Sequence, residues 1–451
     1  MRGLLLAPTH FRVNRSFLLA KHSTTYQRRR LTHPLAYLRN RVSTSETQSA
    51  TRTLYICRNI APPETHKQMI SNLTFSRRRF CGKTLAGLSA VSLLAKVNAQ
   101  TQSTQISDQQ SEALANTARA FMNSCNVPGM SVAIARHTQV VYQRAFGFAN
   151  LDKKEPVSDS SRFRIASVTK PITSVAIFSL IERQKLSLDT RVFGPDAILG
   201  TTYGKPPYNP GVDQITVEHL LTHTCGGWPK GPADPMFHDP EMGHKELISH
   251  TLKTRQLDFA PGTHYAYSNF GFCILGRVIE KVTGVHYAEY VREQVLTPCG
   301  IDEMQIAGNT AGKRAPEEVR YYDQEGGDPY GMNVSRLDSA GGWLATPLEI
   351  VRFATHVDGF PGDLNILKPE TIASMTTGTT ANPHYAKGWE VSAQGRWWHI
   401  GDLPGASSVL LRTPTGYCAA AFMNTRRMQP DIRLVLERAT QDMIRQISNP
   451  S

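Results

Sequence analysis

The segments with strand character in this chain form two groups that lie far apart in the sequence. Residues 130–135 and 140–145 are rich in β-branched and other apolar residues and flank a polar turn. Segments of the same kind recur near the other end of the chain, at 397–400, 408–411 and 417–422. The stretch between the two groups has mainly helical patterns. This order predicts an α+β fold with a mostly antiparallel sheet, in which strands distant in sequence lie side by side.

Several segments have the apolar spacing that is typical of helices. Residues 108–124 are predicted to be helical because Leu114, Ala118 and Phe121 fall on one face. The remaining predicted helices cover the apolar stretch 170–185, residues 215–223 with Thr216 as N-cap, residues 270–282 before Gly284, and the closing segment 429–446.

The net charge of the chain is concentrated at its start. The 451 residues carry a formal charge of +13, but residues 1–99 hold 17 of the 50 Lys and Arg residues and 2 of the 37 Asp and Glu residues. Residues 100–451 therefore hold 33 basic and 35 acidic side chains. A nearly neutral body without a basic stripe argues against a nucleic-acid partner. We predict that residues 100–451 form one catalytic domain.

The cysteines give no sign of a metal site or a disulfide framework. Their number is odd, and none of them forms a C-x-x-C pair. We therefore predict mostly buried free thiols. The seven cysteines are Cys57, Cys81, Cys125, Cys225, Cys273, Cys299 and Cys418.

Residues 69–99 have the organisation of an export signal. The segment SRRRFCGK at 76–83 resembles a bacterial twin-arginine signal, an apolar stretch of 12 residues follows at 84–95, and small residues at 97–99 offer a cleavage site. Twelve residues are too few for a stable membrane span, which needs roughly 20. We expect export to a bacterial periplasm. Residues 1–68, rich in Arg, Ser and Thr, are predicted to be an upstream extension outside the working protein.

The sequence Ser167-Val168-Thr169-Lys170 stands at the entrance of the apolar helix. Positions i and i+3 share a helix face, so the amine of Lys170 is expected beside the hydroxyl of Ser167. A serine becomes a good nucleophile when a neighbouring base takes its proton. A lysine can serve as that base if burial lowers its pKa. Alone, this pattern is also that of an N-cap serine followed by a solvated lysine.

Two further motifs follow in order. Tyr267-Ser268-Asn269 comes one hundred residues after Ser167, and His399-Ile400-Gly401 lies 132 residues beyond Tyr267. Together with the first motif they resemble the signatures of the serine β-lactamase and DD-peptidase superfamily, in the variant related to class C β-lactamases that carries H-x-G. The resemblance covers roughly residues 110–440. It implies a β-lactamase/transpeptidase-like fold, in which an antiparallel sheet is flanked by helices and joined to a helical lobe.

The resemblance also implies roles for individual residues. Ser167 would attack a carbonyl carbon, and Lys170 and Tyr267 would share the work of the base, with the choice between them left open. Asn269, His399 and Gly401 would bind the substrate. The backbone N–H groups of Ser167 and Asp402 would form the oxyanion hole. His223 is interpreted as structural. No metal and no organic cofactor is implied.

His399 stands where many class C β-lactamases carry a lysine, which weakens the case for an efficient β-lactamase because a permanent positive charge is lost. The substrate therefore stays open among peptidyl-D-alanine or peptidoglycan-type peptides, other D-amino-acid peptides, small esters and β-lactams. A binding protein that kept the fold without catalysis is the alternative of another class. The motifs give no oligomeric state.

Overall fold

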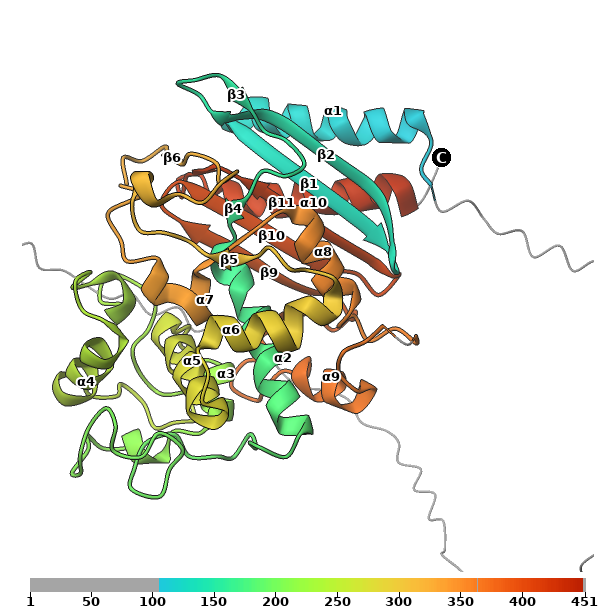
Figure 1. The fold of residues 1–451 in the computed structure, drawn as a ribbon. Coiled ribbons are helices and arrows are strands. Elements are labelled where there is room, and N and C mark those ends of the chain that lie inside the picture. Colours follow the sequence, from blue (N-terminus) through green and yellow to red (C-terminus); the bar gives the residue numbers. More distant parts are fainter. Residues whose placement is uncertain (1–104, 363, 449–451) are drawn as a thin grey trace, which may run out of the picture. The chain divides into compact units, whose positions relative to one another are not determined.

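The computed structural model describes residues 105–362 and 364–448 (Figure 1). The predicted extension 1–68 and export signal 69–99 lie outside the described residues, so both stay predictions. Within the described part, no helix has the length and apolar character needed to cross a membrane.

The main sheet has seven strands in the order β3-β2-β1-β11-β10-β9-β8, and every neighbouring pair is antiparallel. Early and late strands meet at its centre, where Ala133 of β1 lies opposite Ala420 of β11. The predicted α+β fold with an antiparallel sheet is therefore confirmed. The strands are β1 (Gly129–Arg136), β2 (Gln139–Asn150), β3 (Glu155–Pro156), β8 (Glu390–Val391), β9 (Trp397–Leu403), β10 (Ala406–Arg412) and β11 (Tyr417–Met423).

Two terminal helices cover one face of this sheet, α1 (Asp108–Cys125) and α10 (Ile432–Ser448) (Figure 1). Phe121 of α1 and Leu436 of α10 share one apolar cluster with Val132 and other residues of the central strands. The next residue of β1, Ala133, belongs to the cluster on the opposite face. Side chains alternate between faces along a strand, so this central strand is buried on both sides.

The other face of the sheet carries α8 (Pro347–Thr355) and continues into a lobe of helices around α2 (Thr169–Glu182) (Figure 1). Twelve of the 14 residues of α2 are buried, which explains why its sequence is apolar on every side. The helix ends three residues earlier than predicted, because Gln184 adopts a left-handed conformation that stops it.

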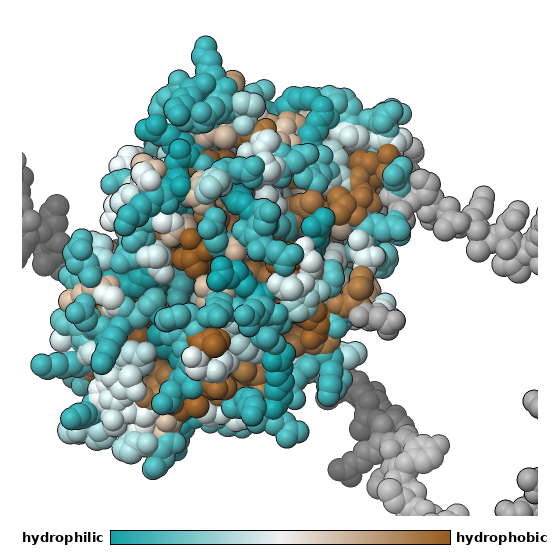
Figure 2. All heavy atoms as spheres, in the orientation of Figure 1, coloured by the Kyte–Doolittle hydropathy of each residue, from teal (hydrophilic) through white to brown (hydrophobic). Residues whose placement is uncertain are grey.

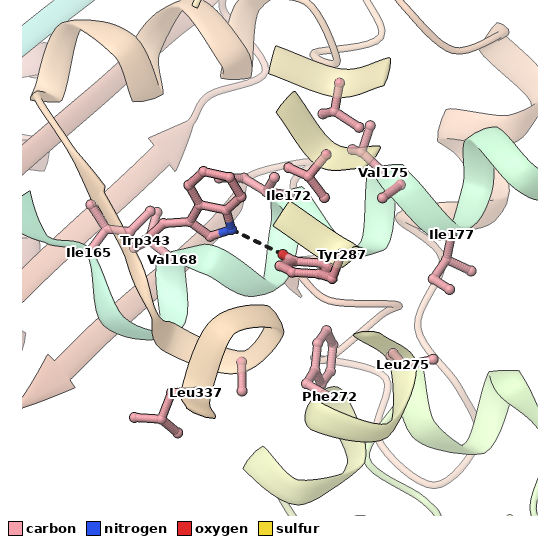
Figure 3. Packing of buried hydrophobic residues seen from close by; sticks show 14 of the residues in the cluster. Ile165, Val168, Ile172, Val175, Ile177, Phe272, Leu275, Tyr287, Leu337 and Trp343 are labelled. Atoms are coloured by element: carbon pink, nitrogen blue, oxygen red, sulfur yellow. Dashed lines mark hydrogen bonds between the residues drawn. The ribbon is translucent and has the colours of Figure 1, made fainter. Parts of the chain in front are cut away.

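Two large aromatic residues inside the lobe have paired polar groups. Figure 3 shows the Trp343 ring nitrogen donating a hydrogen bond to the Tyr287 hydroxyl, at 3.1 Å. The same hydroxyl lies 2.7 Å from the Thr173 hydroxyl of α2. These bonds let Trp343 and Tyr287 fill the core without leaving their own polar atoms unpaired. The remaining lobe helices are α3 (Val217–Leu221), α4 (His244–Thr254), α5 (Asn269–Thr283), α6 (Tyr287–Val291), α7 (Asp338–Gly341) and α9 (Pro369–Met375).

The predicted start of α3 and the predicted end of α5 are confirmed. Thr216 caps α3 by accepting a hydrogen bond from the backbone of His219, and Gly284 ends α5 in a left-handed conformation. Two small sheets complete the fold. They are formed by β4 (Phe163–Arg164), β7 (Trp343–Ala345) and β5 (Gln305–Ile306), and by β12 (Thr425–Arg426) with β6 (Tyr322–Asp323).

The five described cysteines are buried free thiols, as predicted for the chain body. On the face of the molecule in Figure 2, hydrophilic residues surround small hydrophobic patches.

Candidate active site

Ser167 lies in a tight turn between β4 and α2. The turn Ala166–Val168 leads directly into the helix, and Ala166 has a φ of 47°, a strained value for a residue with a side chain. Neighbouring strands hold the turn in place. The Ser408 hydroxyl of β10 donates to the Ile165 carbonyl oxygen at 2.7 Å. The predicted helix start is thus a supported turn that presents the Ser167 hydroxyl.

Gly401 of β9 allows the sheet to approach this turn. A Cβ atom at Gly401 would collide with the Ile165 carbonyl oxygen and the Ser408 hydroxyl, and it would lie 3.0 Å from the Ser167 nitrogen. Only a residue without a side chain leaves that space. The place of Gly401 in its motif therefore has a steric reason, namely the contact between β9 and the Ser167 turn.

Lys170 lies one helical turn after Ser167, as the i, i+3 spacing predicted. Its Nζ atom lies 3.1 Å from the Ser167 Oγ atom, 2.8 Å from Asn269 Oδ1 and 2.7 Å from the Ala340 carbonyl oxygen. The side chain is completely buried. Burial, reinforced by the positive charge of Lys230, holds the pKa of Lys170 well below its usual range, although Asp234 and Asp402 oppose the effect.

For a neutral Lys170, the three contacts determine where the lone pair of the amine points. The Ala340 carbonyl and the Asn269 side-chain oxygen can only accept hydrogen bonds, so each must receive one N–H of the amine. A neutral amine has two N–H groups and one lone pair. The lone pair is then directed at the third neighbour, the Ser167 hydroxyl. The site has the geometry of a serine whose proton is taken by a neutral lysine.

Asp234, which the sequence analysis did not single out, fixes the orientation of Asn269. Its Oδ2 atom accepts a hydrogen bond from Asn269 Nδ2 at 2.8 Å, and its Oδ1 atom accepts one from the Met236 backbone at 3.0 Å. The amide nitrogen of Asn269 therefore faces Asp234, and its oxygen faces Lys170. Asn269 starts α5. Its predicted contact with substrate stays a prediction, because both of its polar atoms have partners in the protein.

Tyr267 lies beside the Ser167–Lys170 pair. Its side chain lies close enough to Ser167 to influence the pKa of the phenol, and the Lys170 Nζ atom lies 4.9 Å from the centre of its ring. Burial raises the pKa of Tyr267 well above its usual range, and the nearby Ser167 side chain offsets this only in part. The phenol thus keeps its proton at neutral pH. This electrostatic environment favours Lys170 over Tyr267 as the base.

His399 belongs to a chain of buried hydrogen bonds. Its Nδ1 atom lies 2.9 Å from the Ile400 carbonyl oxygen, and its Nε2 atom lies 3.2 Å from the Tyr385 hydroxyl. The same hydroxyl lies 3.0 Å from Nε2 of His223. His223 Nδ1 accepts a hydrogen bond from the backbone of Ser268 at 3.1 Å. His223, interpreted from sequence as structural, joins β9 to the Tyr267–Asn269 motif through this chain.

The backbone groups at the two ends of this series of hydrogen bonds, the Ser268 N–H and the Ile400 carbonyl, assign the position of every proton in it. His223 Nδ1 is an acceptor, so its Nε2–H donates to the Tyr385 oxygen. Tyr385 then donates its own proton to Nε2 of His399, whose Nδ1–H donates to the Ile400 carbonyl. Burial lowers the pKa of His399 to about 3, so the ring is neutral at physiological pH. Because both ring nitrogens are occupied by protein groups, the predicted substrate contact of His399 stays a prediction.

The backbone of Asp402 faces the open side of β9. The two-residue turn after Leu403 makes the Leu403–Ala406 pair the closing pair of the β9–β10 hairpin. Alternate residues of a strand turn their backbone groups to opposite neighbours, so Asp402 faces away from β10. On that side, β8 reaches only Trp397 and Trp398. This direction is compatible with the predicted oxyanion hole at Ser167 and Asp402, which stays a prediction.

The side chain of Asp402 forms a charged bridge beside Ser167. It accepts a hydrogen bond from Lys230 at 2.8 Å and pairs with Arg433 of α10. The bridge stands between two cavities that both reach Ser167. A cavity of about 470 Å³ is lined by Asn269 and apolar residues such as Met332. A smaller one of about 230 Å³ is lined by Tyr267, His399 and Glu390.

The structure brings together all of the site residues predicted from the three motifs. The neighbours that sequence reasoning missed come from loops and from distant elements. Asp234 could have been suspected as a buried acid after a Gly- and Pro-rich segment, but nothing in the sequence linked it to Asn269. The missed neighbours of the site are Lys230, Asp234, Tyr385, Glu390, Ser408 and Arg433.

Comparisons with known proteins agree with this arrangement. Esterase EstB of Burkholderia gladioli is 31% identical to this chain over 212 residues, which cover 43% of this chain and 50% of the esterase. Penicillin-binding protein 4* of Bacillus subtilis is 26% identical over 246 residues, covering 52% of this chain and 48% of that protein. The chain spans about half the length of the curated relatives that it matches.

Solved structures share the fold. The D-amino acid amidase from Ochrobactrum anthropi SV3 has a TM-score of 0.62 at 20% identity, covering 75% of this chain and 99% of the amidase. The octameric penicillin-binding protein homologue from Pyrococcus abyssi has a TM-score of 0.58 at 24% identity, covering 69% of this chain and 73% of that one. These likenesses confirm the predicted fold class. The family model described as Beta-lactamase matches residues 114–440, and the chain therefore belongs to the Beta-lactamase family.

Proposed function

We propose that this protein is a serine hydrolase that cleaves an amide or ester through an acyl-enzyme on Ser167. The observation that carries the proposal is the position of the Lys170 amine, 3.1 Å from the Ser167 Oγ atom and turned toward it by two acceptors. A buried lysine whose pKa is lowered can remain neutral and accept the serine proton.

In the first half of the reaction, Lys170 takes the proton of Ser167 while the Oγ atom bonds to the substrate carbonyl carbon. The carbonyl oxygen gains the negative charge, and the N–H groups of Ser167 and Asp402 stabilise it. The bond from carbon to the leaving oxygen or nitrogen then breaks. The leaving group takes a proton, which Lys170 returns through the protonated Tyr267 hydroxyl beside Ser167.

In the second half, a water molecule replaces the leaving group. Lys170 is neutral again and accepts a proton from this water, with the Tyr267 side chain beside Ser167. The hydroxide adds to the acyl carbon, and the bond to Ser167 Oγ breaks. The proton returns to Ser167, and the acid is released.

The names of the relatives support an ester or amide as the substrate. One is called an esterase, one a penicillin-binding protein, and one structural neighbour a D-amino acid amidase. We place a D-amino-acid peptide or amide first, with small esters and β-lactams as the alternatives. The cavity of about 470 Å³ beside Ser167 has room for a substituent of such a substrate.

The test is the intact mass of the full chain after brief exposure to a fluorophosphonate, a labelled penicillin and an activated ester. We expect an adduct on the wild type and none on Ser167→Ala. Lys170→Met should slow the labelling by at least about 100-fold, since removal of a general base typically costs 10²–10⁴-fold. An absence of both labelling and ester turnover in folded wild-type protein would overturn the hydrolase and favour a non-catalytic binding protein.

We also propose that residues 69–99 direct export to a bacterial periplasm. The support is the order of arginines, apolar stretch and small residues in the sequence. Determination of the N-terminus of the protein isolated from its native host would test this proposal, because cleavage of the signal predicts an N-terminus near residue 100. A peptide from residues 1–68 would contradict the prediction that this segment lies outside the working protein.

A further inference from the structure

The smaller cavity beside Ser167, of about 230 Å³, differs from the larger one in its charges. It reaches Tyr267 and His399 and continues to the edge of the sheet at β8. Glu390, the first residue of β8, contributes a carboxyl group to its wall. The complete lining consists of Ser167, Lys230, Tyr267, Glu390, His399, Ile400, Asp402, Arg433 and Leu434.

Each positive charge in this wall already has a negative partner. Lys230 pairs with Asp402 at 2.8 Å. Arg433 pairs with the same carboxylate and with Asp431 at 2.7 Å. With Asp431, which lies outside the lining, two acids balance the two basic side chains of the wall. A negatively charged ligand would have to displace Asp402 or Asp431 from these pairs.

Glu390 has no such partner among the ion pairs of the described residues. The next basic side chain along the chain, Arg396, pairs with Glu437 of α10 at 3.3 Å. An ionised Glu390 therefore gives this cavity one negative charge that no ion pair among the described residues balances, although Arg396 and Arg433 lie close enough to attract it. His399 does not neutralise it, because its two ring nitrogens are bound to Tyr385 and Ile400 and its ring is uncharged.

We propose that this cavity binds a cationic ammonium group of the substrate, with the Glu390 carboxylate as its partner. The inference rests on the proposed function and specifies its substrate class, an ester or amide that carries a positive charge close to the scissile carbonyl. The ammonium group would complete the charge balance of the cavity. A carboxylate partner in a partly enclosed site makes this attraction stronger than it would be in water.

The protonation of Glu390 makes this recognition depend on pH. Burial, supported by the nearby charge of Glu437, raises the pKa of Glu390 to about 7. The carboxyl is neutral below that pH and ionised above it, so ammonium binding strengthens as the pH rises through about 7. The other groups around Glu390 are Arg433 of α10, Arg396 and Trp398 near the β8–β9 turn, and the tyrosines Tyr265, Tyr267 and Tyr385.

Two pairs of isosteric esters test the proposal on either side of the scissile bond. Choline butanoate is compared with 3,3-dimethylbutyl butanoate, in which a carbon atom replaces the charged nitrogen of the alcohol. The p-nitrophenyl ester of 4-trimethylammoniobutanoate is compared with that of 5,5-dimethylhexanoate, which makes the same replacement in the acyl part. The permanent charge of the trimethylammonium group keeps substrate titration out of the pH profile.

The readout is the ratio of kcat/KM for the charged ester to that for its neutral isostere. For at least one pair we expect a ratio of about 10 in the wild type, a typical gain from one charge-assisted contact. The ratio should rise with pH through about 7 and fall to about 1 in Glu390→Gln. The matched control is Asp328→Asn, which removes an acid from the larger cavity and should keep the ratio.

Two results would overturn the ammonium site. They are a ratio near 1 for both pairs in the wild type and a preference that survives Glu390→Gln. Each is distinct from failure of the proposed function, because hydrolysis of the neutral esters and labelling of Ser167 by a fluorophosphonate are measured on the same protein.

Discussion

Asn269 Oδ1 lies 2.8 Å from the Nζ atom of Lys170 and joins the start of α5 to the second residue of α2. This contact uses one N–H group of the amine, and the Ala340 carbonyl uses another. The lone pair of a neutral Lys170 is thereby left for Ser167. The asparagine is thus a hydrogen-bond acceptor for Lys170, and its expected contact with substrate stays a prediction.

Asn269→Asp tests this relationship. The substitution places a carboxylate beside Lys170, which raises the pKa of the amine and leaves less of it neutral. We expect kcat/KM at pH 7 to fall by at least about tenfold and its rise with pH to move to more alkaline values. The pH profile of an activated ester measures both effects. Asn116→Asp on the exposed face of α1 is the control for added charge, and an unshifted profile in Asn269→Asp would contradict the assignment.

Asp234→Asn tests the orientation of Asn269. The Asp234 carboxylate accepts one bond from Asn269 and one from the Met236 backbone, and both donors need an oxygen. An amide offers one oxygen, so one of these bonds must be lost. We expect the rate of Ser167 labelling to fall by about tenfold, which corresponds to one hydrogen bond. Labelling at the wild-type rate would show that Asn269 is held by other contacts.

Gly401→Ala tests the close approach of β9 to the Ser167 turn. The new methyl group would overlap the Ile165 carbonyl oxygen and the Ser408 hydroxyl, so either the strand or the turn must move. We expect the free energy of unfolding to fall by about 1–3 kcal/mol and Ser167 labelling to be largely lost. Urea unfolding and labelling measure the two effects. Gly312→Ala is the matched control, since a Cβ atom there meets nothing within 4 Å.

Tyr385→Phe tests the buried hydrogen bonds that connect His223 with His399. Without the hydroxyl, His223 Nε2–H loses its acceptor and His399 Nε2 loses its donor. We expect the free energy of unfolding to fall by about 2 kcal/mol, because buried polar groups are left unpaired. Tyr208→Phe is the comparison, since that half-buried hydroxyl makes one bond to a backbone oxygen near the surface. An equal loss of unfolding free energy in the two variants would argue against a special contribution of the hydrogen bonds between the histidines.

Nitrogen NMR of the histidine rings gives a second measurement on the same series of hydrogen bonds. The hydrogen-bond order requires the proton of His223 on Nε2 and that of His399 on Nδ1. With a pKa of about 3, His399 should show no titration between pH 5 and 8. Titration of His399 in that range would contradict the assignment.

The sequence by itself determined the elements and the three motifs. Apolar spacing located α1, α2 and α5 to within a few residues, and the Thr216 cap and Gly284 end followed from local backbone chemistry. The Ser167–Lys170 contact was predictable from the i, i+3 spacing, because the turn that holds Ser167 leads directly into α2 and keeps the two side chains on one side.

Tertiary structure alone decided what surrounds that pair. Asp234, Tyr385 and Glu390 reach the site from separate segments, and no local spacing links them to Ser167. The proposed choice of Lys170 as base has the same origin, because it depends on burial and on which acceptors take its N–H groups. A sequence pattern gives the residue types of a site, whereas pKa values and proton positions are set by desolvation and by partners that only the folded chain brings together.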